Sequence, residues 1–182
     1  MFTTKTVIQP AVWLGCLNCY NSGRLVGAWF PCDMIEEVTL ADVHGGAEHV
    51  HPDCEEVLAL DTEYLPDGVG EIDQLAAAAW GELFVEVGSD RWEELLAWYE
   101  KCSPSQDVNG VPSAEDFNEC AQGCWDSFRE FIESWADDCG MFYGWPEEAV
   151  TYFDWDKYER DARYDFTVVD SPNAGVFIFR NC

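Results

Sequence analysis

The chain has 182 residues and a formal net charge of −27, from 36 Asp and Glu against 9 Lys and Arg, yet 48% of its residues are hydrophobic. Acidic disordered segments lack the apolar residues that a core needs, so this composition predicts a folded protein with an acidic exterior. Such a surface excludes direct binding to phosphates and to anionic membranes, since both need clustered Lys and Arg, and it favours basic partners.

The negative charge is unevenly distributed. Residues 1–32 contain no acid, residues 33–90 contain sixteen acids and no Lys or Arg, and residues 91–182 contain twenty acids and seven bases. The carboxylates of residues 33–90 have no Lys or Arg to pair with inside that segment, so we expect them to face water or a basic partner.

The location is inferred from two missing signals. No apolar run reaches the roughly 18 residues of a transmembrane helix, and the N-terminus does not show the pattern of a secretory signal peptide. We therefore expect a cytoplasmic protein whose nine cysteines are reduced thiols.

The first 66 residues predict a small β-β-α-β unit. Residues 12–20 and 25–30 are interpreted as strands joined by a turn at 21–23, residues 33–43 as a helix, and residues 57–60 as a short buried strand. Gly45 and Gly46 are expected to end the helix.

The pattern becomes helical after Pro66, Gly68 and Gly70, which mark a boundary. Apolar residues recur at helical spacing over 72–87 and again over 92–99. A second linker, rich in Pro, Ser, Asn and Gly, covers 103–112. These residues predict a central helical part.

The remaining residues predict helices and a final hairpin. Helices are expected from Ser113 to about residue 122, after the Ser127–Glu130 capping box, after Pro146 and after Asp154. Residues 166–169 and 176–179 predict a β-hairpin. The expected fold class is therefore α+β, with parts covering 1–66, 67–104 and 105–182.

Catalytic and metal motifs are weakly represented. No nucleophile elbow, zincin or P-loop motif occurs, so we predict no enzyme activity and no cofactor. The spacing Cys16-x-x-Cys19 is typical of a zinc half-site, with His49, His51 and Cys54 as further candidates. Because Cys16 and Cys19 fall in a predicted strand, where they would point to opposite faces, we predict no metal site. Cys120 and Cys124 are interpreted as packing residues on a helix.

The acids together suggest a further property. DNA carries one negative charge per ~1.7 Å, so the net charge of this chain equals that of roughly 46 Å of duplex, and carboxylates on successive helix turns recur about every 5.4 Å. Such rows would compete with DNA for a basic groove. The carboxylates expected to form this surface are Asp33, Glu36, Glu37, Glu55, Glu56, Asp61, Glu63, Glu71, Asp73, Glu82, Glu86, Glu93, Glu94, Glu130, Glu133, Asp137 and Asp138.

Aromatic residues are abundant near the C-terminus. They exceed what a small C-terminal core needs, so we expect some of them to form an exposed patch and a two-fold dimer interface. The candidates are Trp135, Phe142, Tyr143, Trp145 and Trp155.

Two segments carry a family resemblance. The run YNSGRLVGAWF at 20–30 resembles the Y-N-x-G-x-L-x-G-x-W signature of ArdA-type antirestriction proteins. Residues 146–161 resemble the C-terminal segment of the same family, with Pro146, then Tyr152-Phe153-Asp154-Trp155, then Arg160-Asp161. The two segments lie in the expected order on a chain of the expected charge.

The resemblance implies a protein of mobile genetic elements that mimics bent B-form DNA. Such proteins bind the DNA groove formed by the specificity and modification subunits of type I restriction–modification enzymes and block restriction and modification. The resemblance also implies an elongated, non-catalytic homodimer that does not itself bind nucleic acid. Two alternatives stay open: a zinc- or calcium-dependent binding module or enzyme, and an acidic chaperone for basic nucleic-acid-binding proteins.

Overall fold

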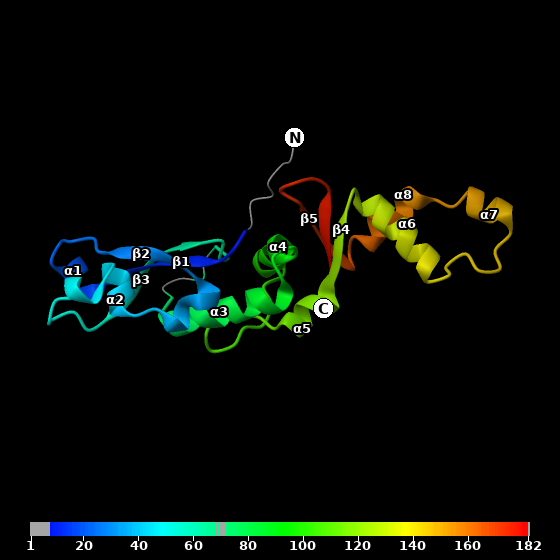
Figure 1. Cartoon of the computed structure of the whole chain (residues 1–182). Helices are drawn as coiled ribbons and strands as arrows, with labels where there is room; N and C mark the ends of the chain where they lie inside the picture. Colours follow the sequence, from blue (N-terminus) through cyan, green and yellow to red (C-terminus); the bar gives the residue numbers. More distant parts are fainter. Residues whose placement is uncertain (1–7, 68, 70–71, 182) are drawn as a thin grey trace, which may run out of the picture. The chain divides into compact units, whose positions relative to one another are not determined.

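The computed structural model describes residues 8–67, 69 and 72–181 (Figure 1). The chain divides into two compact units, unit 1 over Met1–Leu96 and Pro104–Ala114, and unit 2 over Ala97–Ser103 and Glu115–Cys182. Each unit combines helices with a small antiparallel sheet, which confirms the α+β fold class. The division into three parts stays a prediction.

Unit 1 contains a three-stranded antiparallel sheet in the order β2-β1-β3 (Figure 1). The central strand is β1 (Ala11–Cys16), and it pairs with β2 (Gly27–Pro31) and β3 (Val57–Glu63). Val12 and Leu14 of β1 are fully buried. The predicted β-β-α-β unit therefore has its three strands, although β3 is longer than the expected strand at 57–60.

The first predicted strand is too long. β1 ends at Cys16, and helix α1 (Leu17–Asn21) follows directly. The Leu17 N–H still donates to the Glu56 carbonyl at 3.1 Å, but the Asn18 carbonyl already accepts from the Ser22 N–H at 3.1 Å. The strand stops because the backbone carbonyls of residues 18–20 are used within the helical turn.

The predicted helix at 33–43 is broken into two. A 3-10 helix, η1 (Cys32–Glu37), is followed by α2 (Leu40–His44) and a short 3-10 turn, η2 (Ala47–His49). The break has a local cause: the Thr39 N–H and hydroxyl both donate to Asp42 Oδ2, at 2.8 and 2.6 Å, and start a new helix. Gly45 ends α2 in the left-handed conformation at φ 71°, as predicted.

Helix α3 and the first residues of α4 complete the core of unit 1. Asp73 caps α3 (Gln74–Val87) by accepting from the Ala76 N–H at 2.7 Å, and α4 (Trp92–Cys102) follows. Both helices were predicted. The fully buried rings of Trp80 and Trp92 meet edge to face at 6.2 Å. A side chain at Gly81 would collide with the backbone of η1, so glycine is needed where α3 crosses it.

Unit 2 contains a second antiparallel sheet, in the order β4-β6-β5. Its strands are β4 (Ala121–Trp125), β5 (Phe166–Asp170) and β6 (Val176–Arg180), and its helices include α5 (Ala114–Cys120), α6 (Phe128–Asp138), α7 (Glu147–Thr151) and α8 (Trp155–Ala162). The predicted hairpin is confirmed as β5 and β6. Strand β4 was missed. The helix predicted to run to about residue 122 ends at Cys120, and the residues that follow it pair with β6.

The core of unit 2 lies between α6 and its sheet. The buried residues Phe128, Phe131, Ile132, Phe166 and Ile178 form one cluster, in which the Phe131 and Phe166 rings meet at 5.0 Å. Two predicted caps are confirmed: the Ser127 hydroxyl accepts from the Glu130 N–H at 3.2 Å, and Asp154 accepts from the Lys157 N–H at 3.0 Å.

Candidate functional site

The described acids of residues 33–90 lie on the surface of unit 1. Every acid between Asp33 and Asp90 that the structure describes is exposed. The predicted surface residues among them are Asp33, Glu36, Glu37, Glu55, Glu56, Asp61, Glu63, Asp73, Glu82 and Glu86, whereas Glu71 lies outside the described residues. Because residues 33–90 contain no Lys or Arg, their contribution to this surface is negative only.

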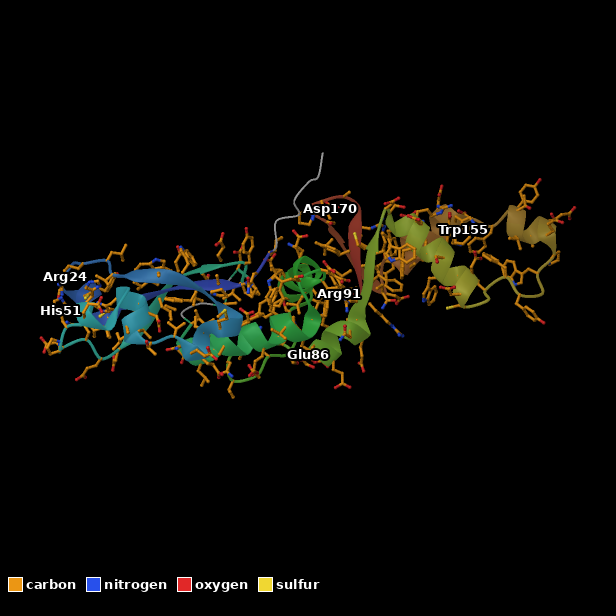
Figure 2. All side chains as sticks on the ribbon, viewed as in Figure 1. Arg24, His51, Glu86, Arg91, Trp155 and Asp170 are labelled. Atoms are coloured by element: carbon orange, nitrogen blue, oxygen red, sulfur yellow. The ribbon has the colours of Figure 1, made fainter. Side chains whose placement is uncertain are left out.

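Several of the exposed acids lie on regular elements. Asp33, Glu36 and Glu37 belong to η1, and Asp61 and Glu63 belong to β3, which is an edge strand of its sheet. Charged side chains on an edge strand discourage pairing with another sheet. Glu82 and Glu86 are one helical turn apart on α3, a like-charged spacing that weakens a helix, and Glu86 is labelled in Figure 2. This arrangement does not serve helix stability.

Asp42 is also exposed and charged. The hydrogen bonds from the Thr39 side chain and backbone hold the pKa of Asp42 below its usual value. The carboxylate form is therefore favoured at lower pH than for an ordinary Asp. By linkage, the stabilisation from this capping box is present above the unfolded-state pKa of Asp42 and is lost as the pH falls through its lower folded-state pKa.

Two acids of α4 do not match the prediction. Glu94 is only 5% exposed, and its Oε2 accepts from Nε of Arg91 at 3.0 Å, while Glu93 is half-buried. A buried carboxylate needs a charged or hydrogen-bonding partner, and Arg91 provides it. Glu94 is therefore not a surface carboxylate, which corrects the sequence-based assignment.

The acids of α6 differ among themselves. Glu130, Glu133, Asp137 and Asp138 are all exposed, but Glu133 pairs with Arg129. Arg129 also lies 3.0 Å from Asp156 and 3.6 Å from Glu159 of α8, and hydrogen bonding to Glu133 raises the pKa of Arg129. Glu133 therefore adds less negative potential than the other three acids.

The predicted interface aromatics are partly used inside unit 2. Phe142 and Trp155 are half-buried and meet edge to face at 5.6 Å, and Trp145 packs against Phe142 at 5.5 Å. Trp135 contacts the Phe166 ring at 6.2 Å. Phe142 and Trp155 are therefore used in the packing of this unit rather than left over for an interface; Trp155 is labelled in Figure 2.

Three of the five predicted interface aromatics are nevertheless exposed. Tyr143 is 94% exposed, Trp145 47% and Trp135 38%. These rings form the part of the predicted interface that is available to a partner.

A cluster of thiols and one imidazole lies at the α1 and α2 end of the unit 1 sheet. The ligand atoms of Cys16, Cys19, His44 and Cys54 all lie within 4.8 Å of one another. Burial and hydrogen bonds within the cluster raise the pKa of Cys19 to about 11. At Cys54 burial also favours the thiol, but hydrogen bonds from Cys16, Asn18 and the His51 backbone outweigh it and lower the pKa.

The cluster changes the sequence-based metal prediction. Cys16 and Cys19 lie near each other because the strand ends at Cys16, so the argument from opposite strand faces was wrong. His49 and His51 are exposed and outside the cluster, whereas His44 was missed. The sequence contained one indication that His44 could be a ligand: it is the last residue before Gly45, where the helix was expected to end, and it lies ten positions before Cys54.

The other cysteines also differ from expectation. Cys120 is buried and disulfide-bonded, which corrects the expectation that all nine are reduced. Cys124 is exposed on β4, where its thiol donates to the Ala174 carbonyl at 3.6 Å. Cys124 is thus not a packing residue on a helix.

The sequence matches a known protein family over most of its length. The family model described as antirestriction protein (ArdA) matches residues 12–175 of the chain. No curated protein matches the sequence. Among the described residues, no helix combines the length and apolarity needed to cross a bilayer.

Proposed function

Because the chain belongs to the ArdA family of antirestriction proteins, we propose that it inhibits type I restriction–modification enzymes by occupying their DNA-binding groove. The partners are the specificity and modification subunits, in the cytoplasm of a host bacterium. The inhibitor is a non-catalytic protein, and it does not bind nucleic acid. The observation that carries this mechanism is the exposure of every described acid between Asp33 and Asp90.

The charge of the surface supports competition with DNA. A groove that neutralises phosphates with Lys and Arg attracts any partner of similar charge density. Residues 33–90 provide sixteen acids without a Lys or Arg among them. Each exposed ion pair contributes at most about 1 kcal/mol, so the affinity must come from many carboxylates acting together.

The proposed DNA-mimic surface is defined by its elements. In unit 1 it comprises the predicted acids of η1, of the loop before β3, of β3, and of α3 with its N-cap Asp73; in unit 2 it comprises a second set, the acids of α6. Glu94 is left out because it is buried against Arg91, and Glu133 contributes less because it pairs with Arg129.

Displacement of DNA tests the proposal. The purified protein should release a labelled duplex containing the recognition site from a type I methyltransferase core. Its affinity should fall roughly tenfold or more between about 50 and 200 mM salt, because ions screen the paired charges. A histone-like basic protein serves as the control partner. Binding that is independent of salt, or equal binding to the control protein, would contradict DNA mimicry and support the acidic-chaperone alternative.

We also propose that unit 2 mediates a homodimer through the exposed Tyr143 and Trp145. Light scattering at micromolar concentration should give about twice the 20.6 kDa chain mass. Replacing both residues by serine should give the monomer, because the interface would lose two aromatic anchors. Tyr164, which is 82% exposed in the same unit, provides a control: Tyr164→Ser should leave the dimer intact. A monomeric wild-type protein would exclude the dimer.

A further inference from the structure

We propose that Cys16, Cys19, His44 and Cys54 form a structural zinc site in unit 1. The role of the site is to hold the end of the three-stranded sheet, which differs from the role of the DNA-mimic acids Glu55 and Glu56 next to Cys54. Its four ligands come from four places in the chain: the end of β1, helix α1, the end of α2 and the loop before β3.

The distances suit one tetrahedral ion. With Zn–S bonds of about 2.3 Å, two thiolates on the same zinc are ~3.8 Å apart. Cys19 Sγ and Cys54 Sγ are 3.9 Å apart, and the four ligand atoms all lie within 4.8 Å of one another. A disulfide would need sulfurs about 2.05 Å apart, so the thiols are spaced for a shared ion rather than for a bond.

The donor set favours zinc over other cations. Thiolate sulfur and imidazole nitrogen are ligands of zinc, whereas calcium and magnesium prefer oxygen. The three cysteines are buried, with at most 6% exposure. Three cysteines and one histidine complete a four-coordinate site, which is the composition of structural rather than catalytic zinc.

The imidazole of His44 provides a second observation. Its Nε2 atom is buried and has no hydrogen-bond partner among the described residues. Buried polar atoms are nearly always paired, so an unpaired nitrogen beside three thiols needs an explanation. Coordination of a metal ion by Nε2 of His44 would explain why this buried nitrogen has no hydrogen-bond partner.

Hydrogen-bond donors surround the sulfurs. Asn18 Nδ2 donates to Cys54 Sγ at 3.8 Å, and Arg24 Nη2 donates to Cys19 Sγ at 3.7 Å. Such outer contacts stabilise thiolate ligands at metal sites. Figure 2 shows Arg24 beside His51 at this end of unit 1, and the two side chains are 3.5 Å apart. Three thiolates with one Zn²⁺ would leave a charge of −1, which the Arg24 guanidinium balances.

A metal would matter here because the local elements are short. Helices α1 and α2 have five residues each, which is far below the length at which a helix is stable by itself. A zinc ion would join both helices to β1 and to the loop before β3. Metal binding of this kind stabilises the folded state because the unfolded chain has no preformed site.

Metal analysis of the full-length protein is the first test. Protein produced with zinc in the medium and dialysed should contain one zinc per chain by mass spectrometry. Cys54→Ser and His44→Ala should lower the content at least severalfold. The matched controls His49→Ala and Cys139→Ser change exposed residues outside the cluster, so they should keep one zinc per chain. Loss of zinc in the controls as well would overturn the assignment.

Replacement of zinc by cobalt tests the geometry of the metal site in the wild-type chain, so the result does not depend on the folding of a variant. The wild-type chain, stripped of metal by a chelator under reducing conditions, should take up one Co²⁺ and develop the intense visible bands of tetrahedral cobalt with sulfur-to-cobalt charge transfer. Addition of zinc should remove these bands. A weak octahedral spectrum, the absence of binding, stoichiometric iron in the purified protein, or a Cys19–Cys54 disulfide found by peptide mapping would each overturn the proposal.

Discussion

Neutralising six carboxylates of unit 1 should abolish inhibition of the target enzyme, whereas neutralising one should change it little. The sixfold variant carries Glu36→Gln, Glu37→Gln, Asp61→Asn, Glu63→Gln, Glu82→Gln and Glu86→Gln. All six side chains are exposed, so the fold should tolerate amides of the same shape. At roughly 0.5–1 kcal/mol for each contact, the affinity should fall by about 10²- to 10⁴-fold. Glu82→Gln alone should cost less than about fivefold.

The matched control removes the same charge elsewhere. It neutralises six exposed acids outside the proposed surface: Glu100, Glu119, Asp126, Glu147, Glu148 and Asp170. Both variants change the net charge from −27 to −21, because each loses six negative charges. Displacement of DNA from the methyltransferase core measures both. Equal losses in the two variants would mean that only total charge matters, and full inhibition by the first variant would reject the proposed surface.

Phe131→Ala should destabilise unit 2 by about 3–5 kcal/mol. Phe131 is 3% exposed, and its ring contacts the rings of Trp125, Phe128 and Phe166 at 5.6, 6.0 and 5.0 Å. Truncation of such a ring removes buried apolar surface and leaves a cavity. Because whole domains are stable by only about 5–15 kcal/mol, this loss is a large fraction of the total.

Hydrogen–deuterium exchange can measure this loss segment by segment. A chain with two compact units need not unfold in one step, so a single melting temperature would mix them. Peptides from β4, α6, β5 and β6 should exchange faster in the variant, and peptides from α3 should not. Tyr143 is 94% exposed, so Tyr143→Ala should change the free energy of opening measured by exchange by less than about 0.5 kcal/mol. Unchanged protection of α6 in Phe131→Ala would contradict the core described for unit 2.

The family match identifies the chain more specifically than its acidic composition does. The two resembling segments, at 20–30 and 146–161, fall within the matched residues 12–175. Composition predicts a folded polyanion, but many acidic proteins fit that description. The antirestriction assignment depends on the motifs, whereas the choice of carboxylates for the proposed surface depends on their exposure.

Local signals in the sequence were sufficient for several elements. Ser127 and Asp154 start α6 and α8 because a side-chain oxygen accepts from a backbone N–H three residues away. Gly45 ends α2 because glycine adopts the left-handed conformation without a steric cost. Two short runs rich in β-branched and aromatic residues, separated by a turn, were enough to predict the β5–β6 hairpin. Each of these features is encoded within a few neighbouring residues.

Tertiary structure decided the features that depend on distant residues. β4 is a strand because Ala121 and Trp125 pair with Phe179 and Val176 of β6. Glu94 is buried because α4 packs into a core, which its local acidic sequence does not indicate.

The thiol and imidazole cluster is the clearest example of such dependence. The β1–β3 register places Cys16 opposite Val57, which brings the loop carrying Cys54 to the end of β1, and α2 brings His44 to the same place. Residues 16, 44 and 54 are far apart in the chain, so no local pattern links them. Spacing in the sequence suggested His49 and His51 as ligands, whereas the folded chain brings His44 to the three thiols. The difference arises because ligand geometry depends on distances in space and not on positions in the sequence.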